Sequence, residues 1–122
     1  VLRQCHDVAG DGGSSIIWYL PTATQAVRFV ESLLAEGIPA ANLYGGQTVY
    51  ANPAYSRQLT VAPSRSPWAG HPVPVSYPPG LCPRAEDLAP RAAAVAVGPG
   101  YTAADLADVA EAVAKVTRAV LG

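Results

Sequence analysis

The chain has 122 residues, of which half are hydrophobic and 14% are charged, and its formal net charge is −1. This length fits one ordinary domain. Scattered basic residues exclude the electrostatic footprint of a protein that binds nucleic acid or an anionic membrane. The longest apolar runs are too short to span a bilayer, and two cysteines are too few for a disulfide framework. We therefore expect a cytoplasmic domain.

The first predicted elements are a strand over residues 14–20 and a helix over residues 23–36. The strand is dense in β-branched and aromatic residues and is apolar on both faces, which indicates that both faces are covered. Thr22 and Gln25 have capping-box spacing, and Gly37 is a natural helix stop. Apolar residues recur at helical spacing between these signals, at Ala26, Phe29, Val30, Leu33 and Leu34. A short edge strand is predicted over residues 38–44, because Pro39 cannot donate to a neighbouring strand.

Residues 45–81 show no helical or strand period. This segment carries seven of the twelve prolines, together with Tyr50, Tyr55, Trp68, His71 and Tyr77. A loop of this length is unusual in a compact domain and is often functional, and it is too aromatic for a disordered linker. Two interpretations stay open: a cover over the domain's own sheet, or an arm that packs on another domain or subunit.

The last third of the sequence predicts a short helix, a buried strand and a long helix. Pro83 suits the first position of the short helix, and Pro90 prevents its extension. The strand covers residues 92–97 and is followed by a Gly98–Gly100 turn. A capped start at Thr102 then precedes apolar residues in helical period, at Leu106, Val109, Ala110, Val113, Val116, Val120 and Leu121. The predicted fold is α+β, a small domain with about three strands covered by helices and the long irregular loop 45–81.

Several residues have side chains that suit catalysis or metal binding. Cys82 precedes Pro83 at a helix start, where the dipole lowers a thiol pKa, although free cysteines are usually buried and inert. Lys115, the only lysine, lies on the solvent side of the last helix, where we expect an ion pair with Glu111 rather than a Schiff base. The glycines of the Gly98–Gly100 turn lack a phosphate-loop pattern. The spacing of Cys5, His6, His71 and Cys82 matches no known pattern of zinc ligands, so we predict no metal site.

The long loop and its approach offer polar side chains in an aromatic setting. Tyr44, Tyr50 and Tyr55 each carry a hydroxyl, and Gln47, Asn52 and Arg57 lie between or beside them. Such a set either lines a site for a polar small molecule or packs tyrosines at an interface. The pattern does not decide between these alternatives.

Five segments occur in an order and spacing that carry a family resemblance. They are a strand, helix and Gly-Ile hinge over residues 14–38, a strand ending at Tyr44, a Val-Tyr-Ala-Asn-Pro segment over residues 49–53, Cys-Pro-Arg-Ala-Glu over residues 82–86 and a strand and turn over residues 95–102. Together they resemble the C-terminal part of the DegT/StrS-type sugar aminotransferases, a pyridoxal-phosphate-dependent family of fold type I. The match covers roughly residues 10 to 122. Leu43 and Gly45 replace the family's histidine and proline on either side of the retained tyrosine.

The resemblance implies that residues 1–122 form a single small C-terminal-type domain, with the cofactor-binding large domain absent from this chain. In the family that large domain supplies the Schiff-base lysine, the acidic partner of the pyridine nitrogen and most phosphate contacts. No catalytic residue is then expected here, and the residues near substrate or cofactor are Tyr44, Gln47, Tyr50 and Asn52. The reaction implied is amino transfer from glutamate or glutamine to a keto-sugar or cyclitol-like substrate, as in sugar or antibiotic biosynthesis. The large domain or a partner subunit would complete a homo- or hetero-oligomer.

A second hypothesis belongs to a different class. The chain is then a non-catalytic α/β interaction or ligand-binding module that keeps the small-domain fold without the chemistry. Leu43 in place of the family histidine favours this alternative, whereas the long aromatic loop favours a partnered enzyme domain.

Overall fold

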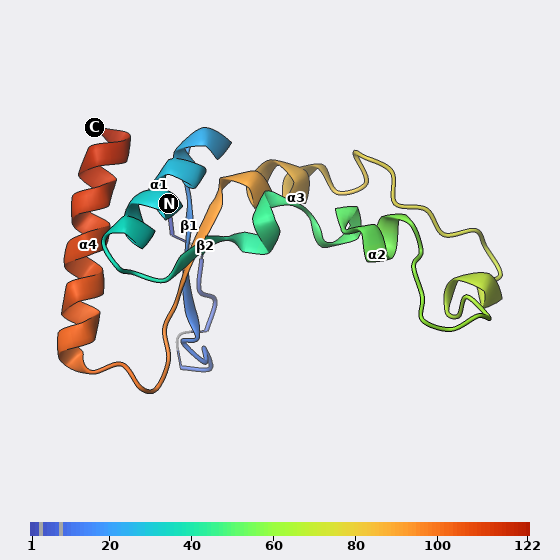
Figure 1. Ribbon diagram of the computed structural model, residues 1–122, viewed down its shortest axis with the longest axis horizontal. Coiled ribbons are helices and arrows are strands. Elements are labelled where there is room, and N and C mark those ends of the chain that lie inside the picture. Colours follow the sequence, from blue (N-terminus) through green and yellow to red (C-terminus); the bar gives the residue numbers. More distant parts are fainter. Residues whose placement is uncertain (3, 8) are drawn as a thin grey trace.

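A three-stranded antiparallel sheet lies at the centre of the fold, which confirms the predicted α+β class (Figure 1). The computed structural model describes residues 1–2, 4–7 and 9–122. Strands β1 (Ser15–Tyr19) and β2 (Ala40–Asn42) lie on either side of β3 (Ala92–Ala96). Both pair with β3 in antiparallel orientation. The predicted edge position of β2 is confirmed, but the strand is shorter than predicted, because the chain turns at Tyr44, Gly45 and Gly46, which all have positive φ.

Helix α1 (Ala23–Ala35) follows β1, and its two ends are fixed by the predicted signals. Thr22 Oγ1 accepts a hydrogen bond from the Gln25 backbone N–H at 3.2 Å. The Gln25 side chain accepts from the Thr22 hydroxyl instead of reaching the Thr22 backbone as predicted. At the other end Gly37 has a φ of +81°, and Ile38 N–H donates to Leu33 C=O at 2.9 Å. The left-handed conformation of Gly37 and this hydrogen bond from Ile38 to Leu33 end the helix.

Helix α4 (Ala103–Leu121) begins with a complete capping box. Asp105 N–H donates to Thr102 Oγ1, and Thr102 N–H donates to Asp105 Oδ2 at 2.7 Å. The buried face differs from the predicted one: the buried residues are Val109, Ala112 and Val116, whereas Leu106, Ala110 and Leu121 are exposed. The helix packs against α1, and this packing turns Ala112 inward.

Lys115 is exposed as predicted, but its predicted partner is wrong. Its Nζ donates to the carboxylate of Glu36 at 2.8 Å, instead of pairing with Glu111 on its own helix. Glu36 ends α1 and lies beside α4, so a contact between helices replaces the i,i+4 pair. Exposed pairs of this kind contribute at most about 1 kcal/mol.

The core lies between the two long helices and one face of the sheet. Phe29, Leu33 and Val95 are fully buried, and the Trp18 ring lies 6.0 Å from that of Phe29, centroid to centroid. On the other face of β3, Ala92 is buried, Ala94 is half-buried and Ala96 is exposed, so the cover decreases along the strand. All five residues of β1 are half-buried, so the predicted cover on both faces of this strand is only partial.

Residues 45–81 form an arm that extends away from the sheet, on the side opposite α4 (Figure 1). The arm contains the short helix α2 (Pro53–Ser56) and two 3₁₀ turns, and it returns to α3 (Pro83–Leu88), which leads into β3. The interpretation of this segment as a cover over the domain's own sheet is therefore wrong. In the described ranges no helix is both long and apolar enough to cross a membrane.

Candidate functional site

The arm leaves the sheet through a tight left-handed turn. Tyr44, Gly45 and Gly46 have φ values of 51°, 66° and 75°. A tyrosine in this region is uncommon and costs energy, and such strain is often found at functional sites. The turn leaves the Tyr44 side chain 69% exposed, beside the end of the sheet.

A cavity of about 390 Å³ lies at this turn, and we call it the arm-root cleft. Its walls come from the turn after β2, the start of the arm, and α3 with the residues that follow it. The lining includes three of the four predicted site residues, and its members are Tyr19, Leu43, Tyr44, Gln47, Thr48, Val49, Tyr50, Cys82, Ala85, Leu88, Ala89 and Ala92. A neighbouring hollow of about 310 Å³ is lined by Tyr44, Gln47 and Asn52, so the four predicted residues do lie close together.

The four predicted residues fall into two pairs with different surroundings. Tyr44 and Gln47 are exposed, they line both hollows, and no side-chain hydrogen bond involves them in the described part of the chain. Asn52 accepts from the Ala54 backbone N–H at 2.9 Å and thereby caps α2. Tyr50 donates its hydroxyl hydrogen to Glu86. Tyr44 and Gln47 are therefore free to meet a ligand, whereas Tyr50 and Asn52 hold the arm.

Glu86 is the acidic residue of the site, and it was not among the residues predicted from the sequence. Its carboxylate accepts a hydrogen bond from the Tyr50 hydroxyl. It also accepts from the Gly80 backbone N–H, whose nitrogen lies 2.7 Å from Oε1 and 3.0 Å from Oε2. The hydrogen bond from Tyr50, followed by that from Gly80, lowers the pKa of the Glu86 carboxyl below its ordinary value. Burial, followed by the bond to Glu86, raises the pKa of the Tyr50 phenol. The signal in the sequence was Glu86 in the Cys-Pro-Arg-Ala-Glu segment, which we used only for the resemblance.

An aromatic cluster holds the rest of the arm together. Tyr77 stacks on Tyr50 with a centroid distance of 6.4 Å and contacts Trp68 edge to face at 5.9 Å. Tyr55 meets both Trp68 and Tyr77 edge to face. The offset and edge-to-face arrangements are the favourable ones for aromatic rings. Tyr50, Tyr55, Trp68 and Tyr77 therefore pack on one another, although none of them is fully buried.

Cys82 occupies the predicted N-cap position of α3 but is not buried. It is exposed, it lines the arm-root cleft, and its thiol makes no cap hydrogen bond within the described residues. The expectation of a buried cysteine is therefore wrong. Among the residues that the structure describes, no group of three or more His, Cys, Asp or Glu side chains could hold a metal ion.

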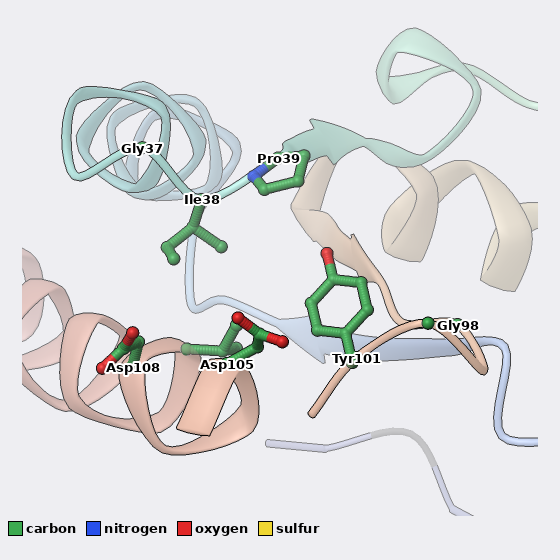
Figure 2. Close-up of a pocket in the computed structure, with 9 residues that line it drawn as sticks. Gly37, Ile38, Pro39, Gly98, Tyr101, Asp105 and Asp108 are labelled. Atoms are coloured by element: carbon green, nitrogen blue, oxygen red, sulfur yellow. The ribbon is translucent and has the colours of Figure 1, made fainter. Parts of the chain in front are cut away.

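A second pocket, of about 550 Å³, lies between the end of α1 and the start of α4 (Figure 2). Ile38 and Pro39 lie on one side, the Gly98–Gly100 turn and Tyr101 on another, and Asp105 and Asp108 project from α4. Two carboxylates repel an anion, so this pocket does not suit a phosphate group. The glycine turn is a connection, as its sequence indicated.

Comparison of the chain with protein-family models, curated proteins and solved structures finds no match.

Proposed function

We propose that this chain is the small-domain part of a pyridoxal-phosphate-dependent aminotransferase that acts on a keto-sugar or cyclitol-like substrate. A large domain or partner chain supplies the cofactor and the Schiff-base lysine. The observation that carries the proposal is the pair Tyr44 and Gln47, exposed and without side-chain partners in the described residues, at the mouth of the arm-root cleft. The order of family-like segments in the sequence supports the same assignment.

The residues that the structure describes do not form a complete cofactor site. Lys115, the only lysine, is 62% exposed and paired with Glu36, so it is not desolvated as a Schiff-base lysine must be. Among the described residues, no basic side chain lines the cleft to hold a phosphate. Pyridoxal phosphate acts as an electron sink when an enzyme of this class holds it. In this proposal that group is held by other polypeptide, and this chain helps to bind the substrate.

Tyr44 and Gln47 suit a polyhydroxylated substrate. The phenol both donates and accepts a hydrogen bond, and the amide offers two donors and an acceptor. The rest of the cleft is mostly apolar, which suits the C–H face of a sugar or cyclitol ring. Such a mixture of an apolar wall and a few placed polar groups is usual in small-molecule sites.

The arm supports the need for other polypeptide. Leu59, Val61 and Val73 are 58%, 107% and 63% exposed on it. Residues 45–81 contain two arginines and no acidic residue, whereas all nine acidic residues lie elsewhere in the chain. An exposed apolar and basic extension is suited to contact a partner surface, which in this proposal belongs to the large domain or a second subunit.

Co-expression with a lysine-bearing large domain of this enzyme class tests the proposal. The purified complex is expected to show the visible absorption of lysine-bound pyridoxal phosphate and to transfer an amino group from glutamate or glutamine to a keto-sugar. Tyr44→Phe and Gln47→Ala should each lower kcat/KM by about two- to tenfold, which corresponds to one lost hydrogen bond. Tyr101→Phe is the matched control, because that tyrosine lines the α4 pocket instead.

A well-folded complex with neither visible absorption nor amino transfer would refute the enzyme assignment. The chain would then be the non-catalytic interaction or ligand-binding module. Equal effects of Tyr44→Phe and Tyr101→Phe would refute the placement of the substrate at the arm-root cleft, even if the complex is active.

A further inference from the structure

We infer that Glu86 is a positioning residue, which joins the two ends of the arm to α3 and thereby sets the wall of the arm-root cleft. The inference concerns contacts inside this chain, so it does not rest on the pyridoxal phosphate proposal. Glu86 does not line the cleft, whereas Tyr50, which donates to Glu86, and Cys82, at the start of the same helix as Glu86, do. Its role is therefore exerted through its neighbours.

The geometry places one carboxylate between the outgoing and returning ends of the arm. Tyr50 lies 36 residues before Glu86 and Gly80 lies six residues before it, and both donate to the Glu86 carboxylate. Gly80 has a φ of +86°, the left-handed conformation that glycine adopts without steric cost. A contact that ties the ends of a long segment removes much of the conformational freedom of that segment.

The neighbouring acidic residue of α3 turns to the opposite side. Asp87 pairs with Arg91, and Arg91 donates to the Leu20 carbonyl oxygen at the end of β1. The six-residue helix α3 therefore joins the arm through Glu86 and the sheet through Asp87. Loss of the Glu86 contact should release the arm while the sheet and its helices stay folded.

The same contact decides what Tyr50 offers to a ligand. The Tyr50 hydroxyl hydrogen is directed to Glu86, so the phenol has no second hydrogen to donate. The ring is also fixed, because it stacks on Tyr77. Tyr50 therefore shapes the cleft with its ring, whereas Tyr44 and Gln47 are polar groups that stay open to a ligand.

Glu86→Gln tests this role in the full chain, by amide hydrogen exchange resolved by segment. The substitution replaces an acceptor oxygen with an amide NH₂ opposite the Gly80 N–H donor. We expect exchange in residues 48–80 to rise about tenfold, consistent with loss of a charged hydrogen bond, while β3 and α4 stay protected. Glu111→Gln is the matched control, because Glu111 is exposed and has no hydrogen bond or ion pair within the described residues. Unchanged exchange in residues 48–80 would overturn the inference.

A second readout reports on Tyr50 directly. Because Glu86 helps to raise the pKa of the Tyr50 phenol, Glu86→Gln should move that pKa toward its ordinary value. Titration of ¹³C-labelled tyrosine by NMR, with Tyr50→Phe to assign the signal, measures the change. Should Glu86→Gln unfold the chain, Tyr50→Phe alone takes its place in the exchange experiment. Normal exchange over residues 48–80 in that variant would also overturn the inference.

Discussion

Two adjacent leucines in α1 allow a sharp test of the packing. Leu33 is fully buried between the sheet and α4, whereas Leu34, the next residue, is 53% exposed. Leu33→Ala removes three carbon atoms from the core. At about 0.8 kcal/mol for each buried carbon, the transfer loss is about 2.4 kcal/mol, and the cavity left behind adds about 1 kcal/mol. We expect Leu33→Ala to lower the free energy of unfolding by about 3–4 kcal/mol.

Leu34→Ala is the matched control, because it removes the same atoms from the same helix. We expect it to cost less than about 1 kcal/mol, since half of this side chain already contacts solvent. Urea unfolding followed by far-UV circular dichroism measures both variants, with the denaturant slope checked for constancy. Equal losses in the two variants would refute the assigned orientation of α1. A larger loss for Leu34→Ala than for Leu33→Ala would refute that orientation as well.

Three further predictions concern the helix ends and the surface. Gly37→Ala should cost about 1 kcal/mol in urea unfolding, because its φ is positive, whereas Gly98→Ala, at a glycine with ordinary φ, should cost less. Hydrogen bonds from Thr102 lower the pKa of Asp105 below its ordinary 3.8, so the ionised carboxylate stabilises the folded state. The free energy of unfolding should therefore fall as the pH drops from above 3.8 through the lower pKa that Asp105 has in the folded state. The fall should be smaller in Asp105→Asn, and parallel pH profiles of the two proteins would contradict this. Lys115→Gln should change the free energy of unfolding by less than about 1 kcal/mol. A larger change would show that the ion pair with Glu36 is not a surface contact.

Local signals in the sequence predicted the main elements well. The start of α1 at Thr22, its stop at Gly37 and the start of α4 at Thr102 all depend on contacts within a few residues. Capping bonds and backbone conformations of this kind are the same in many folds, so a short window of sequence is enough to identify them. The strands followed from short segments before α1 and between α1 and α4.

The candidate site was predicted in part. Tyr44 and Gln47 belong to a set of polar residues near an aromatic segment, from which the family resemblance selected them. The structure places both at the arm-root cleft without side-chain partners among the described residues. Tyr50 and Asn52 were chosen in the same way, but their hydrogen bonds hold the arm. A sequence shows which side chains can form hydrogen bonds. The neighbours of each side chain in the folded structure decide which of them already have a hydrogen-bond partner.

The sequence by itself determined the α+β class, the helix ends and the irregular nature of residues 45–81. Only the tertiary structure decided that this segment extends as an arm, that Lys115 pairs with Glu36 and that Glu86 joins the two ends of the arm. The physical reason is the separation of the partners along the chain. Lys115 and Glu36 are 79 residues apart and Tyr50 and Glu86 are 36 apart, so the packing of α1, α4 and α3, and no local pattern, brings these groups together.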